Sequence, residues 1–342
     1  MHMNSTGSAK INRTTLRDVA QLAGVSEISV SRVMRNAPNI SDALRKKVMT
    51  AADTLSYTPN RVAGALRNQS SNLVAVVLPS MSNEVFSAVL DGVETILAQH
   101  GLNAVLGLSN YDRERELQVV RELLSWSPSG IILTGLHHDA TIESMIRQQG
   151  IPVVQIMDIE GTPLDSAVGI SHTKAAEAAA DHLYERGFRN IGYIGAWRER
   201  PDRSRARRLS FAARLNELCM SLDASKIVEE RSSALVGATA TAELLSDHPN
   251  IDAIFYANDD LALGGLFHAM SEGLRIPEDI GFLGFNGIGV GKATPTPLSS
   301  IETPRYEMGV RAAELLLNSQ SDERSEKFVV DLDFKVFQGG TT

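Results

Sequence analysis

The sequence predicts two kinds of structure in one chain: an all-α helix-turn-helix head and an α/β body of two lobes, each built on a doubly wound parallel sheet. Three observations lead to this prediction. Residues 15–35 have the pattern of two short amphipathic helices around a tight turn. From Leu73 onward, apolar runs of strand length alternate with helical stretches. The charge is also divided between a basic N-terminal part and an acidic remainder.

The first helix of residues 15–35 has a clear apolar face. Its apolar residues recur at i, i+3, i+4 and i+7 and are Leu16, Val19, Ala20 and Ala23. Gly24 then suits a sharp turn, because glycine adopts a positive φ without a steric penalty. Ser26 stands where an N-cap would satisfy the first N–H groups of a second helix. The spacing therefore predicts two helices joined by a tight Ala23-Gly24-Val25 turn.

The second helix is expected to present polar side chains to its surroundings. Its buried residues are Val30, Val33 and Met34. Its outward residues are Glu27, Ile28, Ser31 and Arg32. In a helix-turn-helix the second helix enters the major groove of DNA with its N-terminal residues on base edges. Taken by itself, this stretch leaves an ordinary helical hairpin of an enzyme as the alternative.

Composition and charge favour a globular protein that contacts nucleic acid at one end. The 342 residues are 43% hydrophobic and 22% charged, which predicts two or three ordinary domains. Residues 1–70 contain ten Lys or Arg and four Asp or Glu, whereas the remainder contains 23 and 37. A net charge of +6 on the head and −14 on the body favours DNA contact confined to the head.

Cysteine content and hydropathy exclude several other classes. Cys219 is the only cysteine, so an intrachain disulfide and a cysteine-based metal cluster are excluded. No window approaches the roughly 18 apolar residues of a membrane span, and no signal peptide is visible. The chain is therefore expected in the cytoplasm, without contact with a membrane.

Four segments are expected along the chain. Residues 1–12 are polar, without pattern, and are expected to be disordered. Residues 13–58 form the helix-turn-helix domain, with a third helix from Ser41 to Leu55. Residues 59–71 form a short hinge helix from Asn60 to about Leu66 and a polar linker, and residues 72–342 form the body.

The body has the sequence pattern of parallel sheets that helices cover on both faces. Its expected strands are Leu73–Pro79, Ala104–Leu108, Gly130–Leu133, Pro152–Ile156, Ile191–Ile194, Ala253–Tyr256 and Gly281–Phe285. Its expected helices include Val85–Gln99, Arg113–Ser125, Ala175–Glu185, Ser210–Met220, Ala238–Leu245 and Leu261–Ser271. This length exceeds one doubly wound sheet, so two lobes are expected, with a ligand cleft at the carboxyl ends of the strands.

Together these features resemble the LacI/GalR family of bacterial repressors, from about Thr15 to Gly340. The head carries the signature T-L-x-D-V-A-x-x-A-G-V-S-x-x-x-V-S-R-V. Further matching segments are Pro59–Ala63, Tyr256–Asp260, Ala262–Gly264 and Pro297–Ile301. Segments that resemble the gluconate-operon repressor branch are Leu124–Trp126, Pro152–Val154, Met157-Asp158 and Gly284–Gly287. The resemblance implies a periplasmic-binding-protein-like body, with lobe 1 at about 72–170 and 302–329 and lobe 2 at about 171–301 and 330–342.

The resemblance assigns base reading to three residues of the second helix. Arg32 suits bidentate donation to guanine O6 and N7, which discriminates by about 1–3 kcal/mol. Glu27 can accept from cytosine N4, with a favourable helix-dipole charge as its alternative role. Ile28 can pack on a thymine methyl group. Phosphate contacts or helix caps are expected at Thr15, Ser26, Ser29, Ser31 and Asn39.

The hinge helix is expected to contact the minor groove. In the family, hinge helices from two subunits wedge a leucine into the central base step, and Leu66 matches that leucine. Its alternative role is to cover the linker junction. Asn60, Arg61 and Ala63 are the other expected contacts of this helix.

The resemblance also identifies candidate ligand contacts in the body. Counted back from Phe211, Arg207 matches the cleft arginine, whose guanidinium suits a carboxylate or a pair of hydroxyls. The other arginines of residues 198–208 are expected to face solvent. Asp158 is expected to accept from ligand hydroxyls. Many relatives carry an aspartate where Asn286 stands, often followed by a second one, so Asn286-Gly287 favours an anionic sugar.

Phe86 and Asp259 complete the candidate cleft. Phe86 matches a position that packs on the ligand, with a core role as its alternative, and Asp259 matches a strand-end acid that is more often structural. The expected effector is gluconate or another aldonate, with a neutral sugar or a purine as alternatives. No residue distinguishes an inducer from a corepressor. A homodimer on a pseudo-palindromic duplex DNA operator is expected, with no cofactor, metal or catalytic residue.

Two rival functions are disfavoured. Residues 287–294 superficially suggest a phosphate loop, but Asn286 and Ala293 stand where G-x-x-x-x-G-K-[ST] requires Gly and Ser/Thr. No G-x-S-x-G or H-E-x-x-H occurs either, so an enzyme is disfavoured. A periplasmic sugar-binding protein would share the body, but the basic head and the missing export signal argue against it.

Overall fold

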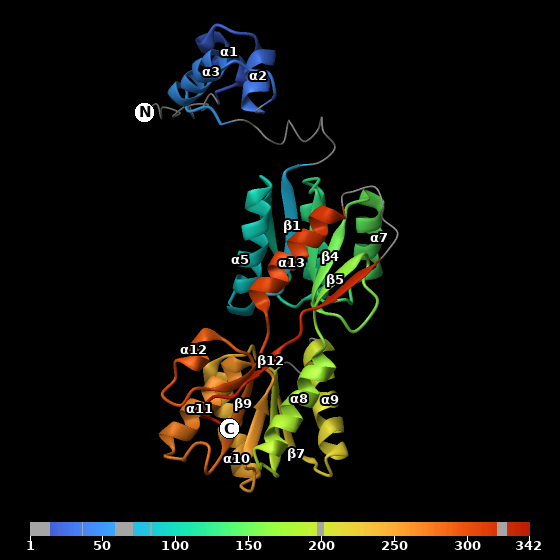
Figure 1. Cartoon of the computed structure of the whole chain (residues 1–342), viewed down its shortest axis with the longest axis vertical. Coiled ribbons are helices and arrows are strands. Elements are labelled where there is room, and N and C mark those ends of the chain that lie inside the picture. The colour runs from blue at the N-terminus through green and yellow to red at the C-terminus, as the bar shows by residue number, and fades with distance from the viewer. Residues whose placement is uncertain (1–13, 36, 59–70, 83, 197–201, 320–326) are drawn as a thin grey trace, which may run out of the picture. The chain divides into compact units, whose positions relative to one another are not determined.

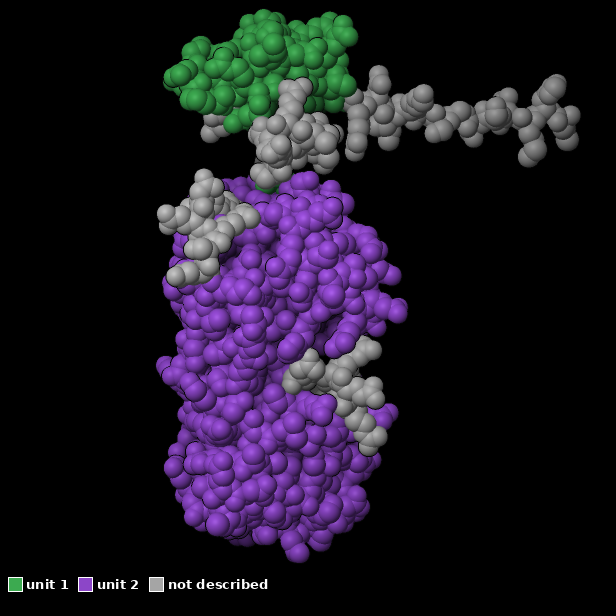
Figure 2. Space-filling view, turned by 90° about the vertical axis from the view of Figure 1, so that its right-hand side faces the viewer, with its two compact units in different colours: residues 1–71 green, residues 72–342 purple. Residues whose placement is uncertain are grey.

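The computed structural model describes residues 14–35, 37–58, 71–82, 84–196, 202–319 and 327–342. The chain divides into two compact units, residues 1–71 and residues 72–342 (Figure 2). None of the described helices combines the length and the apolar character that crossing a bilayer requires.

The first unit is a three-helix head. Its helices are α1 (Leu16–Ala23), α2 (Glu27–Met34) and α3 (Asp42–Thr54) (Figure 1). Gly24 ends α1 at φ 56°, in the left-handed region that glycine adopts at little cost. Three short helices enclose one small core, formed by Val19, Ala20, Ala23, Val30, Val33, Val48, Ala51 and Ala52.

The second unit contains two six-stranded sheets in its described residues, one in each lobe. The lobe 1 sheet has the order β11-β5-β4-β3-β1-β2, and all its pairs are parallel. Its strands are β1 (Leu73–Leu78), β2 (Asn103–Leu108), β3 (Gly130–Thr134), β4 (Val153–Asp158), β5 (Ser166–Ile170) and β11 (Phe328–Asp331).

Helices cover both faces of the lobe 1 sheet, as the strand pattern explains. Alternate residues of β1 point to opposite faces, so Val74 and Val76 pack beneath α5 (Glu84–Gln99) and α13 (Arg305–Asn318). Ala75 and Val77 pack beneath α6 (Arg113–Leu124) and α7 (Ala140–Gln149). Figure 1 shows α5 and α13 crossing the same face.

The lobe 2 sheet has the order β12-β10-β9-β8-β6-β7, with one antiparallel pair, β10 with β12. Its strands are β6 (Ile191–Ala196), β7 (Leu222–Val228), β8 (Ala253–Tyr256), β9 (Gly281–Asn286), β10 (Ser299–Glu302) and β12 (Lys335–Phe337). Its helices are α8 (His172–Glu185), α9 (Asp202–Glu217), α10 (Ala234–Asp247), α11 (Asp259–Ser271) and α12 (Gly289–Lys292).

The chain passes between the lobes three times within the described residues. The passages lie between β5 and α8, between β10 and α13, and between β11 and β12. The antiparallel edge strand β12 therefore belongs to lobe 2, although β11 belongs to lobe 1.

One helix begins earlier than its apolar pattern suggests. The periodicity predicts a helix from Ser210, whereas α9 begins at Asp202. Its first two turns are formed by residues 202–208, which include four arginines. Arginine has high helix propensity but contributes no apolar repeat, so the pattern of apolar residues does not mark this start.

Candidate functional site

The start of α1 is closed by a capping box. The carboxylate of Asp18 accepts from the backbone N and the Oγ1 of Thr15, both at 2.7 Å, and these hydrogen bonds lower the pKa of Asp18. The Oγ1 of Thr15 accepts in turn from the N–H of Asp18 at 3.4 Å. Thr15 is therefore a helix cap in this structure.

Helix α2 presents its predicted base-reading side chains to solvent. Ser26 caps it by accepting from the N–H of Ser29 at 3.1 Å. Glu27 and Arg32 are exposed, and 73% of the Ile28 surface is exposed, which is unusual for so apolar a side chain. The buried face of α2 is held by Val30 and Val33, so the opposite face is available to DNA.

The remaining predicted contacts of the head have different positions. Ser31 is half-buried on α2, and Asn39 is exposed in the α2–α3 connection at φ 59°. The Nη2 of Arg32 donates to the carbonyl of Pro38 at 3.4 Å, which places this guanidinium beside the connection. Asn60, Arg61, Ala63 and Leu66 lie outside the described residues.

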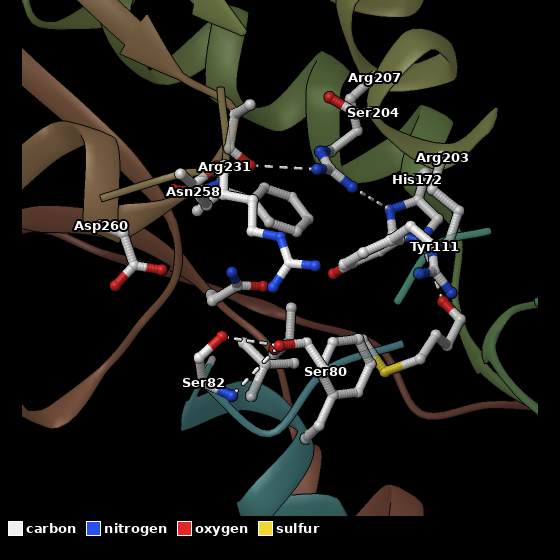
Figure 3. Close-up of a pocket in the computed structure, with 18 of the residues that line it drawn as sticks. Ser80, Ser82, Tyr111, His172, Arg203, Ser204, Arg207, Arg231, Asn258 and Asp260 are labelled. Carbon is white, nitrogen blue, oxygen red and sulfur yellow. Dashed lines mark hydrogen bonds between the residues drawn. The ribbon is translucent and has the colours of Figure 1, made fainter. Parts of the chain in front are cut away.

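The body contains a cavity of about 460 Å³ lined by both lobes (Figure 3). Lobe 1 contributes residues from the ends of β1, β2 and β4, and lobe 2 contributes residues from α8, α9 and the ends of β8 and β9. It lies at the carboxyl ends of the strands, where ligands bind in doubly wound sheets.

Arg207 is fixed in the wall of this cavity. Its Nη2 donates to the carbonyl of Ala257 at 3.0 Å, and its guanidinium carbon stands 4.0 Å from the ring centroid of Phe285. Burial lowers its pKa to about 10, so it stays cationic at neutral pH. Its Nε is buried without a hydrogen-bond partner. A guanidinium held in this way is a rigid donor for an anionic group.

His172 holds the guanidinium of Arg207 through a hydrogen bond. The Nη1 of Arg207 donates to the Nδ1 of His172 at 3.0 Å, and the Nε2 of His172 donates to the carbonyl of Met157 at 2.9 Å. Burial, followed by the charges of Arg207 and Arg203, lowers the pKa of His172 well below its usual value. This imidazole is therefore neutral, and it links α8 of lobe 2 to β4 of lobe 1.

The structure brings three of the five predicted cleft residues to the cavity. Arg207, Phe86 and Asn286 line it, although Phe86 is only 2% exposed and also belongs to the core of lobe 1. Asp158 instead lines an adjoining cavity of about 360 Å³, and its carboxylate accepts from the N–H of Glu160 at 2.9 Å.

Asp259 does not line the cavity, and its role is structural. Its carboxylate accepts from the N–H of Ile288 and from the Oγ of Ser300, both at 2.7 Å. Burial raises its pKa to about 6. These bonds hold the turn that follows β9, and Asn286, at φ 111°, is the last residue of that strand.

The cavity also contains polar residues that sequence reasoning did not identify. They are Ser80, Ser82, Tyr111, His172, Arg203, Ser204, Arg231, Ser232, Ser233, Asn258, Asp260 and Thr303. Arg203 was expected to face solvent with the other arginines of residues 198–208, but it is half-buried and lines the cavity. It lies four residues before Arg207, so the helical repeat could have identified it if the start of α9 had been known. No linear signal marks Tyr111 or Arg231, because they come from separate connections.

The charges of the lining favour an anion. The described lining residues include three guanidinium groups and one carboxylate. The guanidinium groups are those of Arg203, Arg207 and Arg231, and the carboxylate is that of Asp260. All four lie within electrostatic reach of the buried phenol of Tyr111, whose pKa is raised mainly by burial. The pKa of Asp260 is raised as well, by burial and then by Glu84.

Comparisons with known proteins agree with this architecture. Residues 15–60 match the bacterial regulatory proteins of the lacI family, and residues 71–336 match the periplasmic binding proteins and sugar binding domain of the LacI family. The HTH-type transcriptional regulator GntR of Pseudomonas aeruginosa is 35% identical over 340 residues, covering 99% of this chain and 98% of that protein. The GntR of Escherichia coli K12 is 36% identical over 332 residues, covering 97% and 99%.

Solved structures give the same result. A LacI-family transcriptional regulator from Silicibacter pomeroyi is similar with a TM-score of 0.90 at 39% identity, covering 96% of this chain and 99% of that one. The lac repressor dimer bound to operator and the anti-inducer ONPF is similar with a TM-score of 0.83 at 25% identity, with the same coverage. The predicted fold class and family are confirmed.

With a helix-turn-helix head, a two-lobed sugar-binding-type body and relatives that span nearly its whole length, the chain belongs to the LacI family and is a DNA-binding transcriptional regulator, not an enzyme.

Proposed function

We propose that this regulator represses genes of sugar-acid catabolism and that an aldonate such as gluconate, bound in the inter-lobe cavity, releases it from its operator. The observation that carries the proposal is the cationic lining, in which three arginines face one aspartate. A carboxylate of the ligand is attracted by this excess of positive charge in the lining, whereas a neutral sugar or a purine gains no such attraction. The name GntR of the similar regulators is consistent with a gluconate-type ligand.

The proposed release depends on contacts that the ligand makes with both lobes. A bound carboxylate contacts Arg207, which His172 connects to Met157 of lobe 1. Hydroxyls of the sugar chain reach Ser80 and Ser82 of lobe 1 and Asn286 of lobe 2. A ligand shifts an equilibrium only through unequal affinity for two states. The ligand is therefore expected to favour a lobe arrangement that weakens operator binding.

The DNA contacts are proposed for a homodimer on a pseudo-palindromic operator. Two recognition helices match two half-sites related by the dimer axis. In each head, Arg32, Glu27 and Ile28 read bases and Ser29, Ser31 and Asn39 contact phosphates, while Thr15 and Ser26 cap the helices that carry these contacts. Asn60, Arg61, Ala63 and Leu66 supply the minor-groove contacts.

Operator binding with and without ligand tests the proposal. Fluorescence anisotropy with a labelled operator fragment at fixed salt is expected to give an affinity that gluconate lowers by tenfold or more. Glucose and hypoxanthine at the same concentration serve as neutral controls. Release by either control, or tighter operator binding with gluconate, would contradict the proposed inducer.

A further inference from the structure

We propose that Glu84 and Arg305 of lobe 1 form a latch on a turn of lobe 2, residues 287–289, and that this latch stabilises the lobe arrangement that the ligand favours. The inference rests on the proposed function, because it assigns the regulation of the same cavity to contacts outside the ligand. The turn directly follows Asn286, which lines the cavity at the end of β9.

Lobe 2 holds this turn by two hydrogen bonds. The N–H of Gly287 donates to the Oγ of Ser300 at 3.1 Å, and the N–H of Ile288 donates to the carboxylate of Asp259 at 2.7 Å. Both acceptors belong to buried residues of lobe 2. The turn therefore moves with lobe 2.

Lobe 1 bonds the same turn through the first residues of two helices. The Oε1 of Glu84, at the start of α5, accepts from the N–H of Gly289 at 3.3 Å. The Nη2 of Arg305, at the start of α13, donates to the carbonyl of Gly287 at 3.1 Å. Figure 1 shows α12, which begins at Gly289, at the end of lobe 2 nearest to α5 and α13. An acceptor and a donor of lobe 1 thus hold the turn from the opposite side.

Glu84 and Arg305 belong to one tightly packed part of lobe 1. Helices α5 and α13 cross so closely that a Cβ at Gly309 would meet the carbonyl oxygen of Val89. Within the described part of the chain, the buried Nη1 of Arg305 has no hydrogen-bond partner, and an unpaired buried donor costs stability. The contact with lobe 2 therefore explains the position of Arg305 better than stabilisation of lobe 1 does.

The latch and the ligand favour the same arrangement of the lobes. Both lobes line the cavity in this structure, so a ligand that contacts both lobes stabilises this arrangement. A movement that separates the two walls of the cavity also separates Glu84 from Gly289. Loss of the latch should therefore make release from the operator less complete, even when the cavity is saturated with ligand.

Operator binding by full-length variants tests the latch. Fluorescence anisotropy gives the operator dissociation constants at saturating gluconate and without it, and their ratio measures the coupling. We expect Glu84→Ala and Arg305→Met each to lower this ratio by about threefold or more. Glu122→Ala, at an exposed glutamate of α6, is the matched control and should keep the ratio. A variant that only binds gluconate more weakly regains full release at saturation, so the ratio reports the lobe equilibrium.

Glu84→Gln separates the hydrogen bond from the charge. Burial and then the charge of Glu84 raise the pKa of Asp260, a lining residue of lobe 2, so the two carboxylates repel each other across the lobe boundary. Glutamine keeps an acceptor for the N–H of Gly289 and removes this repulsion. Its ratio should equal or exceed that of the unchanged protein. A loss as large as that of Glu84→Ala would overturn the hydrogen bond as the basis of the latch.

A cross-link tests the latch without any ligand. In protein that also carries Cys219→Ser, the substitutions Glu84→Cys and Gly289→Cys place two thiols at exposed positions. A bifunctional methanethiosulfonate reagent joins them, and a reductant releases them. The cross-linked protein should bind operator about tenfold more weakly than the same protein after reduction. Equal or tighter binding by the cross-linked form would overturn the latch, and single-cysteine variants treated with the reagent are the controls.

The outcomes separate this inference from the proposed function. Weak operator binding by the cross-linked protein, together with no effect of gluconate on the unchanged protein, would overturn the gluconate proposal and keep the latch. Release of the unchanged protein by gluconate, together with an unaltered ratio in Glu84→Ala and Arg305→Met, would overturn the latch and keep the gluconate proposal. Thermal unfolding without ligand verifies that each variant is folded.

Discussion

The Nη1 of Arg207 donates to the Nδ1 of His172 at 3.0 Å, and this pair joins the ligand cavity to the boundary between the lobes. The other ring nitrogen of His172 donates to the carbonyl of Met157 in lobe 1. Since both ring nitrogens are engaged and the ring is buried, the tautomer and the orientation of His172 are defined. Arg207 is thereby presented to the cavity in one geometry.

Removal of His172 should weaken ligand binding through Arg207. In His172→Leu the Nη1 of Arg207 loses its acceptor, and hydrogen bonds to charged groups contribute about 1.5–3 kcal/mol. We expect gluconate affinity to fall by tenfold or more in calorimetric titration. His248→Leu, an exposed histidine after α10, is the control and should bind like the unchanged protein. Unaltered affinity in His172→Leu would show that Arg207 needs no support.

Arg32→Ala should remove operator discrimination without unfolding the head. The side chain is exposed, and its one described hydrogen bond, to Pro38, is long at 3.4 Å. A bidentate contact with guanine discriminates by about 1–3 kcal/mol, so preference for operator over a scrambled fragment should fall by about 5–150-fold. Gel shift at fixed salt measures this preference. Arg17→Ala, on the exposed face of α1, is the control and should weaken binding to the operator and to the scrambled fragment alike. If Arg32→Ala still prefers the operator, Arg32 does not read bases.

Asp259 should make stability fall as pH rises from about 4 to about 6. Its folded pKa of about 6 exceeds the ordinary value of 3.8, so the folded state binds the proton more tightly than the unfolded chain. Deprotonation therefore costs stability, and a difference of about two units corresponds to about 3 kcal/mol.

The measurement compares chemical unfolding of the protein and of Asp259→Asn across this pH range. The buried His172 changes stability with pH in the opposite direction. Its pKa is lowered, so the folded state favours the neutral ring, and stability falls as the pH drops below about 6.5. The difference between the two proteins isolates Asp259. A difference that stays constant from pH 4 to pH 7 would contradict the raised pKa.

Gly309→Ala should destabilise lobe 1 by about 1–3 kcal/mol or more, because overpacking forces the backbone to shift. A Cβ at Gly309 would meet the carbonyl oxygen of Val89, since α13 and α5 approach backbone to backbone. Gly289→Ala is the control, because its Cβ would meet only the Glu84 carboxylate at 3.7 Å, and it should change stability by less than about 0.5 kcal/mol. Denaturant unfolding of both variants checks the difference.

The head shows how much local sequence predicts. Thr15 and Ser26 cap helices, and Gly24 takes the left-handed turn, as their positions predict. Each of these interactions joins residues within four positions of one another. Capping and turn chemistry depend on the identity of a few neighbouring residues, so they can be inferred without knowing the fold.

The sheets are predicted less completely. The seven expected strands correspond to β1–β4, β6, β8 and β9. All of them except the edge strand β2 are apolar runs that are largely buried. Strands β5, β7 and β10 were not expected. Strand β7 is an edge strand with the mixed sequence Leu222–Val228, whereas β5 and β10 are buried but short, and serine or glycine interrupts their apolar residues. Strands β11 and β12 are short and largely exposed, so their pairing rather than their apolar content defines them.

By itself the sequence determined the family, the helix-turn-helix and the alternation of strands and helices, since these follow from spacing along the chain. Only the tertiary structure decided the composition of the cavity. It brought Tyr111, His172, Arg207 and Arg231 together from four separate segments, and it placed the carboxylate of Asp259 outside the cavity, against Ile288 and Ser300. The physical reason is that caps and turns arise between neighbours, whereas a binding site arises where distant strand ends converge.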